Sequence, residues 1–145
     1  MTIIKHIYSN VKGGIATAAS IELEITENDL LSHRIFVEVE KIPFQSQGMI
    51  EGGHKVWVLS AKRALEVILK KIDLGKANDI TIKKLEGRIF LDTNNASIGV
   101  ACILGVMKYM KMHLTDSKLE KIDTFVCENW ESEIEEIPNF EYLFN

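Results

Sequence analysis

The sequence predicts an α+β fold in which one mostly antiparallel sheet carries two or three helices on a single face. Two observations indicate this class. Apolar and polar residues alternate with a period of two in the first third of the chain, as in strands with one buried face. Later segments repeat apolar residues every three or four positions, as amphipathic helices do. The length of 145 residues fits one domain.

The amino-terminal third predicts three strands. Residues 3–8 are rich in residues that favour strands, and Gly13 and Gly14 end that segment. Residues 17–25 come to alternate apolar residues with glutamates, and residues 34–42 show a similar alternation. Each segment therefore predicts a strand that buries one face and exposes the other.

The next stretch predicts a loop, a short strand and a first helix. Residues 43–53 contain three glycines and a proline, and we expect them to form a mobile loop. Residues 55–59 are largely apolar and predict a short strand. Ser60 is a favourable N-cap, and the apolar spacing after it predicts a helix over residues 61–73.

Two further strands and a second helix complete the predicted body. Residues 79–84 and 88–91 predict short strands joined by a turn at residues 86–87. Residues 93–95 offer capping side chains ahead of a helix predicted over residues 96–112. These elements add strands to the same sheet and a second helix to one of its faces.

Two glycines, Gly99 and Gly105, lie within the second predicted helix. A glycine inside a helix costs about 1 kcal/mol relative to alanine. Such a cost is offset where the missing side chain allows close packing. Both glycines therefore predict a close approach of this helix to the sheet.

Residues 116–145 differ in charge from residues 1–115. They hold nine acidic and two basic residues, whereas the rest of the chain has a net charge of +3. We expect an α+β body over residues 1–115 and an acidic, mostly helical tail packed on it. The apolar spacing favours a helix over residues 116–137, although residues 124–127 also fit an edge strand. The aromatic residues after Pro138 are expected to dock on the chain's own core.

The composition argues against several classes of function. A net charge of −4 does not supply the basic surface on which nucleic-acid binding depends. No apolar stretch is long enough to span a membrane. The four histidines and two cysteines lack the spacing of a zinc site, so we expect neither a metal nor a cofactor. Two isolated thiols and the lack of a signal-peptide pattern favour a cytoplasmic location.

Residues 55–112 contain two runs with a familiar pattern, VWVLSAKRALEVILKKIDLGKANDITIKKLEG and DTNNASIGVACILGVMKYM. In this part the chain resembles the Lon-type proteolytic domain and the related Lon-like domains of ComM and the magnesium chelatases. These domains share the ribosomal protein S5 domain 2-like fold, which also carries small-molecule kinases. The resemblance therefore implies that fold.

The resemblance also implies a candidate nucleophile. In the Lon family the catalytic serine lies at the start of a helix, in a Pro-Ser-Ala-Gly-Ile-Ala setting, and Ser97 falls near that position. The family pairs this serine with a downstream lysine in a Gly-Gly-x-Lys setting, which this chain lacks. A serine needs such a base to act as a nucleophile. The remaining candidates for the base are Lys118 and Lys121.

Two binding sites follow from residue type and position. Asn94, Asn95 and Ser97 lie at the start of a predicted helix, where free N–H groups and the helix dipole suit a phosphate group. Aromatic side chains are enriched in binding hot spots. The candidates for contact with a partner protein are Trp57, Trp130, Tyr142 and Phe144.

These features lead to one main expectation and two alternatives. The main expectation is a small stand-alone Lon-like domain, without complete catalytic machinery, that acts by protein–protein interaction. An exposed strand at the sheet edge would bind a partner protein or a second copy of the chain. The first alternative is a serine–lysine hydrolase or peptidase that depends on Ser97. The second is phosphate or nucleotide binding at residues 94–97.

Overall fold

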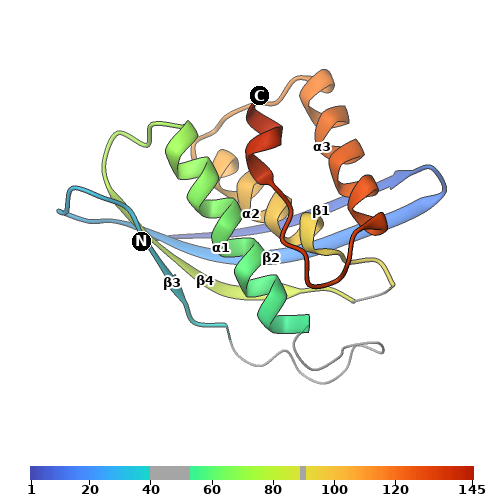
Figure 1. Cartoon of the computed structure of the whole chain (residues 1–145). Helices are drawn as coiled ribbons and strands as arrows, with labels where there is room; N and C mark the ends of the chain where they lie inside the picture. The colour runs from blue at the N-terminus through green and yellow to red at the C-terminus, as the bar shows by residue number, and fades with distance from the viewer. Residues whose placement is uncertain (40–52, 89–90) are drawn as a thin grey trace.

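The computed structural model describes residues 1–39, 53–88 and 91–145. They form one four-stranded sheet whose helices lie on a single face (Figure 1). Across the sheet the order is β1 (Thr2–Lys12), β2 (Ile15–Glu27), β4 (Asn78–Glu86) and β3 (Arg34–Val37). Only the β3–β4 pair among these strands is parallel. The predicted α+β class is confirmed, with a mostly antiparallel sheet and its helices on one face.

β1 and β2 form a long hairpin that makes up half of the sheet. Gly13 and Gly14 connect the two strands with φ angles of 60° and 78°. Positive φ at both central positions is typical of a type I′ turn, which matches the twist of the strands and favours glycine. Along β2 every second side chain from Thr17 to Ile25 is buried, as the alternation in the sequence predicts.

β3 is shorter than the strand predicted over residues 34–42. It ends at Val37, and residues 40–42 lie outside the described residues, as does most of the loop expected over 43–53. Arg34 donates from Nε and Nη2 to the two carboxylate oxygens of Asp79, at 2.8 and 2.7 Å. This bidentate pair joins the start of β3 to β4.

α2 (Asn95–Tyr109) is the central helix of the layer that covers the sheet. Twelve of its 15 residues are buried, as expected for a helix that is apolar on all sides. It contacts β1 and β2 of the sheet, α1 (Gly53–Lys71) and α3 (Asp116–Glu128). Figure 1 shows α1 and α3 on either side of α2.

The strand predicted over residues 55–59 is wrong, because these residues form the first turns of α1. A short apolar run has no clear period and fits either kind of element. Ser60 lies inside the helix instead of capping it, and its hydroxyl donates to the Asn95 carbonyl oxygen at 2.6 Å. The helix predicted over residues 61–73 therefore begins and ends earlier than expected.

The separate strand predicted over residues 88–91 is also wrong. The strand predicted over residues 79–84 extends through residue 86 as one strand, whose pairing with β2 is irregular. Leu91 belongs to a turn in which its N–H donates to the Arg88 carbonyl oxygen at 3.2 Å. Residues 89–90 lie outside the described residues.

The second helix ends at Tyr109, three residues before the end of the predicted range 96–112. Lys111 has a φ of 55°, in the left-handed region that often follows the end of a helix. The N–H of Met112 then donates to the Met107 carbonyl oxygen at 3.0 Å. This local closure stops the helix although the apolar spacing continues.

The carboxyl-terminal segment, residues 129–145, packs across α1 and α3. It contains two short 3₁₀ helices, η1 (Asn129–Glu131) and η2 (Phe140–Phe144). The edge strand considered for residues 124–127 is wrong, because these residues are part of α3. Phe140 is fully buried and contacts α2.

Gly105 and Gly99 face different neighbours. A Cβ at Gly105 would lie 3.2 Å from Ile21 Cδ1 and 3.4 Å from Ile4 Cγ2, which confirms the predicted approach to the sheet. A Cβ at Gly99 would instead overlap the ring of Phe140. The predicted sheet contact of Gly99 is wrong, because this glycine makes room for the carboxyl-terminal segment.

Gly99→Ala is expected to lower the free energy of unfolding by about 1–3 kcal/mol, because the new methyl group displaces the buried Phe140 ring. Urea denaturation measures this change. Gly105→Ala is the matched control and should cost less, since only the ends of flexible side chains lie near it. Equal losses in the two variants would contradict this account of Gly99.

Candidate functional site

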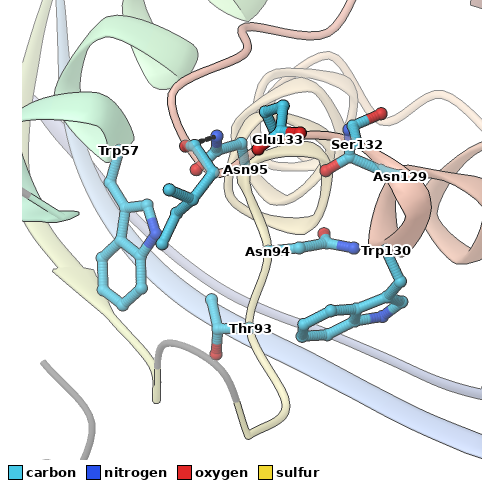
Figure 2. A pocket seen from close by; sticks show the side chains of 9 residues that line it. Trp57, Thr93, Asn94, Asn95, Asn129, Trp130, Ser132 and Glu133 are labelled. Carbon is cyan, nitrogen blue, oxygen red and sulfur yellow. Dashed lines mark hydrogen bonds between the residues drawn. The ribbon is translucent and has the colours of Figure 1, made fainter.

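A cavity of about 300 Å³ lies at the start of α2 (Figure 2). Trp57 from α1 lines one side of it, and five residues that follow α3 line another: Asn129, Trp130, Ser132, Glu133 and Ile134. Asn94, Asn95 and Trp130, which separate sequence arguments singled out, also line this cavity. The structure thus brings two of the aromatic candidates together with the first turn of α2.

Ser97 caps α2 from inside the protein. Its side chain is fully buried and belongs to a capping box with Asn94. Ser97 Oγ accepts from the Asn94 N–H at 3.0 Å and donates to the Asn94 carbonyl oxygen at 2.8 Å. The Ser97 N–H in turn donates to Asn94 Oδ1 at 2.8 Å. The hydroxyl is therefore engaged in holding the helix start.

The carboxyl-terminal segment supplies further partners to the start of α2. The N–H of Ala96 donates to Asn129 Oδ1 at 3.2 Å. Asn95 Nδ2 donates to the carbonyl oxygens of Ile134 and Glu136, at 2.7 and 2.9 Å. Two of the N–H groups that a helix start leaves free are thus already bonded to neutral asparagine side chains, those of Ala96 and Ser97. An anion would have to compete with these side chains.

The two tryptophans differ in how their indole nitrogens are satisfied. Trp130 Nε1 donates to Thr17 Oγ1 at 2.9 Å. Trp57 is 0% exposed, and its Nε1 has no hydrogen-bond partner among the described residues. Figure 2 shows the two rings on different sides of the cavity, with Asn94 between them.

The two candidate lysines bond elsewhere. Lys121 Nζ donates to the Asn145 carbonyl oxygen at 2.8 Å and lies 4.8 Å from the centroid of the Tyr142 ring. Lys118 is exposed in the first turn of α3. In the part of the chain that the structure describes, Ser97 has no hydrogen bond to a lysine. A serine–lysine pair therefore stays a prediction without a geometric basis.

The other aromatic candidates do not line the cavity. Tyr142 is exposed and stacks on Phe125 with the ring centroids 6.2 Å apart. Phe144 is half-buried against the core. Partner contact through these two residues stays a prediction.

Sequence reasoning missed four residues of the cavity wall. They are Asn129, Ser132, Glu133 and Ile134. They lie within residues 116–137, whose apolar spacing predicts one helix, but α3 ends at Glu128 and the chain turns toward α2. No local signal relates these residues to the start of α2. Their position is set by the tertiary hydrogen bonds of Asn95 and Asn129.

The outer edge of β1 is a second candidate surface. Ile3, Ile7 and Val11 of this strand are 50%, 71% and 78% exposed and lie on the open face of the sheet, opposite the helices. β1 is an end strand of the sheet and, among the described residues, pairs with β2 alone. Lys108 Nζ donates to the Lys5 carbonyl oxygen at 3.2 Å. The end strand thus offers a backbone that has a strand on one side only, next to apolar side chains on the open face of the sheet.

Two features that bear on function are not found in the described residues. They contain no group of three or more histidine, cysteine, aspartate or glutamate residues that could hold a metal ion. Of the helices that the structure describes, none is both long and apolar enough to cross a membrane.

Comparison with known proteins concerns the fold alone. No protein-family model and no curated protein matches the chain. A protein of Thermus thermophilus, ttk003000868, is similar over 74% of this chain and 16% of its own, with 11% identity and a TM-score of 0.53. Its fold is therefore similar, but at this identity nothing about activity follows.

Two kinases show weaker likeness. Mevalonate kinase matches 92% of this chain and 48% of its own, with 16% identity and a TM-score of 0.49. Streptococcus pneumoniae phosphomevalonate kinase matches 87% of this chain and 42% of its own, with 14% identity and a TM-score of 0.40. The chain thus spans less than half the length of each of these three structures. At these TM-scores the two kinases bear on neither the fold nor the activity of this chain.

Ser97→Ala is expected to lower the free energy of unfolding by about 1 kcal/mol, because it removes one half of the capping box. Wild-type protein should not be modified at Ser97 by an acylating or phosphonylating probe, since the hydroxyl is buried and bonded to Asn94. Mass spectrometry of the treated protein tests this. Labelling that disappears in Ser97→Ala would establish the hydrolase alternative instead.

The two thiols are expected to differ in reactivity. Burial raises the pKa of the Cys102 thiol to about 12, so almost no reactive thiolate forms near neutral pH. Cys127 is only half-buried. A disulfide reagent should therefore modify one thiol per folded chain and both thiols in urea. Cys127→Ser should abolish the fast reaction, and a fast reaction that survives this change would contradict the assignment.

Proposed function

We propose that this protein is a non-catalytic interaction domain that associates with a second copy of itself through the outer edge of β1. The observation that carries the proposal is the exposed apolar row of Ile3, Ile7 and Val11 on an 11-residue end strand. Monomeric proteins commonly protect such an edge with charges, proline or a covering element. In β1 the side chains on the open face of the sheet are three apolar residues, one lysine and one serine, and Lys108 Nζ bonds a single edge carbonyl oxygen, that of Lys5.

The sequence of β1 suits antiparallel pairing with its own copy. A twofold axis at Ile7 places Ile7 opposite its counterpart and Ile3 opposite Val11 of the second copy. In the same register Lys5 lies opposite Ser9, so no like charges meet directly. In each of these pairs both residues are odd-numbered. The N–H and carbonyl groups that point away from β2 in one copy can therefore meet those of the other copy. The proposed register therefore sets apolar residues opposite apolar residues and Lys5 opposite Ser9.

We propose a domain without catalysis because of the hydrogen bonds that Ser97 makes at the start of α2. Ser97 uses its hydroxyl to cap the helix, and the candidate lysines have no described bond to it. The domain would thus be a Lon-like relative that keeps the fold without the serine–lysine chemistry. The two free thiols, Cys102 and Cys127, suit a reducing compartment, and we include a cytoplasmic location in the proposal.

Ile7→Lys is expected to convert a dimer into a monomer, because it places two ammonium groups opposite each other at the proposed twofold axis. Analytical ultracentrifugation over a range of concentrations measures the mass. Leu31→Lys is the matched control, since Leu31 is fully exposed but lies in the turn before β3. It should leave the dimer unchanged.

Two results would contradict the proposal. One is a wild-type protein that stays monomeric at all concentrations. The other is an Ile7→Lys variant that associates as strongly as the wild type, which would place any interface elsewhere on the surface. Both results leave the cavity at α2 untouched, because β1 does not line it.

A further inference from the structure

We propose that the cavity at the start of α2 is a binding site for a small uncharged ring compound that accepts a hydrogen bond from Trp57 Nε1. The inference does not depend on self-association through β1. It rests on an unpartnered buried donor, on the state of the helix start, and on the aromatic lining of the cavity.

The first observation is the buried N–H group of Trp57 Nε1, which has no hydrogen-bond partner among the described residues. A buried N–H without a partner is destabilising, and such groups are rare in folded proteins. Three buried side-chain atoms have no partner among the described residues, those of Asn10, Asn78 and Trp57. Trp57 is the one of these three residues that lines this cavity. Figure 2 shows the nitrogen edge of its ring turned toward the enclosed space. A ligand oxygen or ring nitrogen placed there would satisfy this donor.

The helix start and its surroundings favour a ligand without negative charge. The N–H groups of Ala96 and Ser97 are bonded to Asn129 and Asn94 and are not free for an anion. Glu133 contributes the only acidic side chain that lines the cavity among the described residues, and it is exposed. A carboxylate repels phosphate and accepts hydrogen bonds from hydroxyl or amino groups. An uncharged molecule with such groups therefore suits the cavity better than a phosphate does.

The size and aromatic walls favour a ring. The half-buried Trp130 indole offers an apolar surface to a planar ring or to the C–H face of a sugar, whereas the fully buried Trp57 presents its nitrogen edge. Two indoles, those of Trp57 and Trp130, line a cavity of about 300 Å³, at the small end of ligand sites. One monosaccharide or one nucleobase fits this description. Both share the required chemistry, a neutral ring with hydrogen-bond acceptors at its edge.

The two tryptophans allow a direct test on the full chain, which contains no others. A ¹H–¹⁵N correlation spectrum shows one indole signal for each of them. Glucose and N-acetylglucosamine form the sugar arm of a titration, adenosine and uridine form the base arm, and inorganic phosphate is the anionic control. We expect the Trp57 indole signal to shift in a saturable way in one neutral arm. The Trp130 signal should move less, because its N–H stays bonded to Thr17.

Variants locate the binding. Trp57→Phe keeps an aromatic ring but removes the N–H, and should weaken binding of the active probe about tenfold. Tyr142→Phe lies outside the cavity and is the control that should leave binding unchanged. If Trp57→Phe does not fold, Ile134→Phe fills the cavity from another wall with Trp57 intact. It should abolish the shift of the Trp57 signal.

The remaining outcomes overturn the proposal. A Trp57 signal that no neutral probe moves in the millimolar range would mean that the cavity does not take this class of compound. Phosphate that shifts the amides of Ala96 and Ser97, while the neutral probes have no effect, would establish an anion site. Binding that persists unchanged in both Trp57→Phe and Ile134→Phe would place the ligand elsewhere.

Discussion

The hydrogen bonds of three asparagine side chains at the start of α2 are the interaction on which the rest of the structure depends. Asn94 and Asn129 accept from the N–H groups of Ser97 and Ala96, and Asn95 donates to two carbonyl groups of the carboxyl-terminal segment. A helix start leaves N–H groups without partners, and this one is buried in the core. Leaving those groups unbonded would be costly, so the carboxyl-terminal segment must return to this point.

The same bonds limit what the site does. A nucleophilic serine or a phosphate site at a helix start needs free N–H groups and, for the serine, a base. Here the N–H groups of Asn94, Ala96 and Ser97 are bonded to side chains of the protein, and Ser97 is part of the cap. What remains open beside the helix start is a cavity with two indoles and one unsatisfied donor on Trp57. Binding of an uncharged ligand fits these surroundings better than acyl or phosphoryl chemistry does.

The sequence predicted the sheet best in strands that bury one face and expose the other to solvent. The first two strands and the break at Gly13 and Gly14 were predicted correctly, because both signals are local, whereas their pairing as a hairpin was not predicted. The prediction failed at residues 55–59, which belong to α1. A short apolar stretch at the start of a helix has the same composition as a short strand. The prediction also failed at Gly99, whose neighbour Phe140 is distant in the sequence. The cavity itself was not predicted. The sequence offered four of its lining residues as separate candidates, because the segment after α3 reaches the start of α2 only through tertiary hydrogen bonds.

The central claim is that the protein's own asparagines close the start of α2. Native-state hydrogen exchange of the Ala96 and Ser97 amides tests it most directly. We predict that both amides exchange as slowly as the interior of α2 and that phosphate leaves their rates unchanged. In Asn129→Ala the exchange of Ala96 should accelerate, while Ser97 stays protected by Asn94. Fast exchange of both amides in the wild type, slowed by phosphate, would contradict the account and show an open anion site.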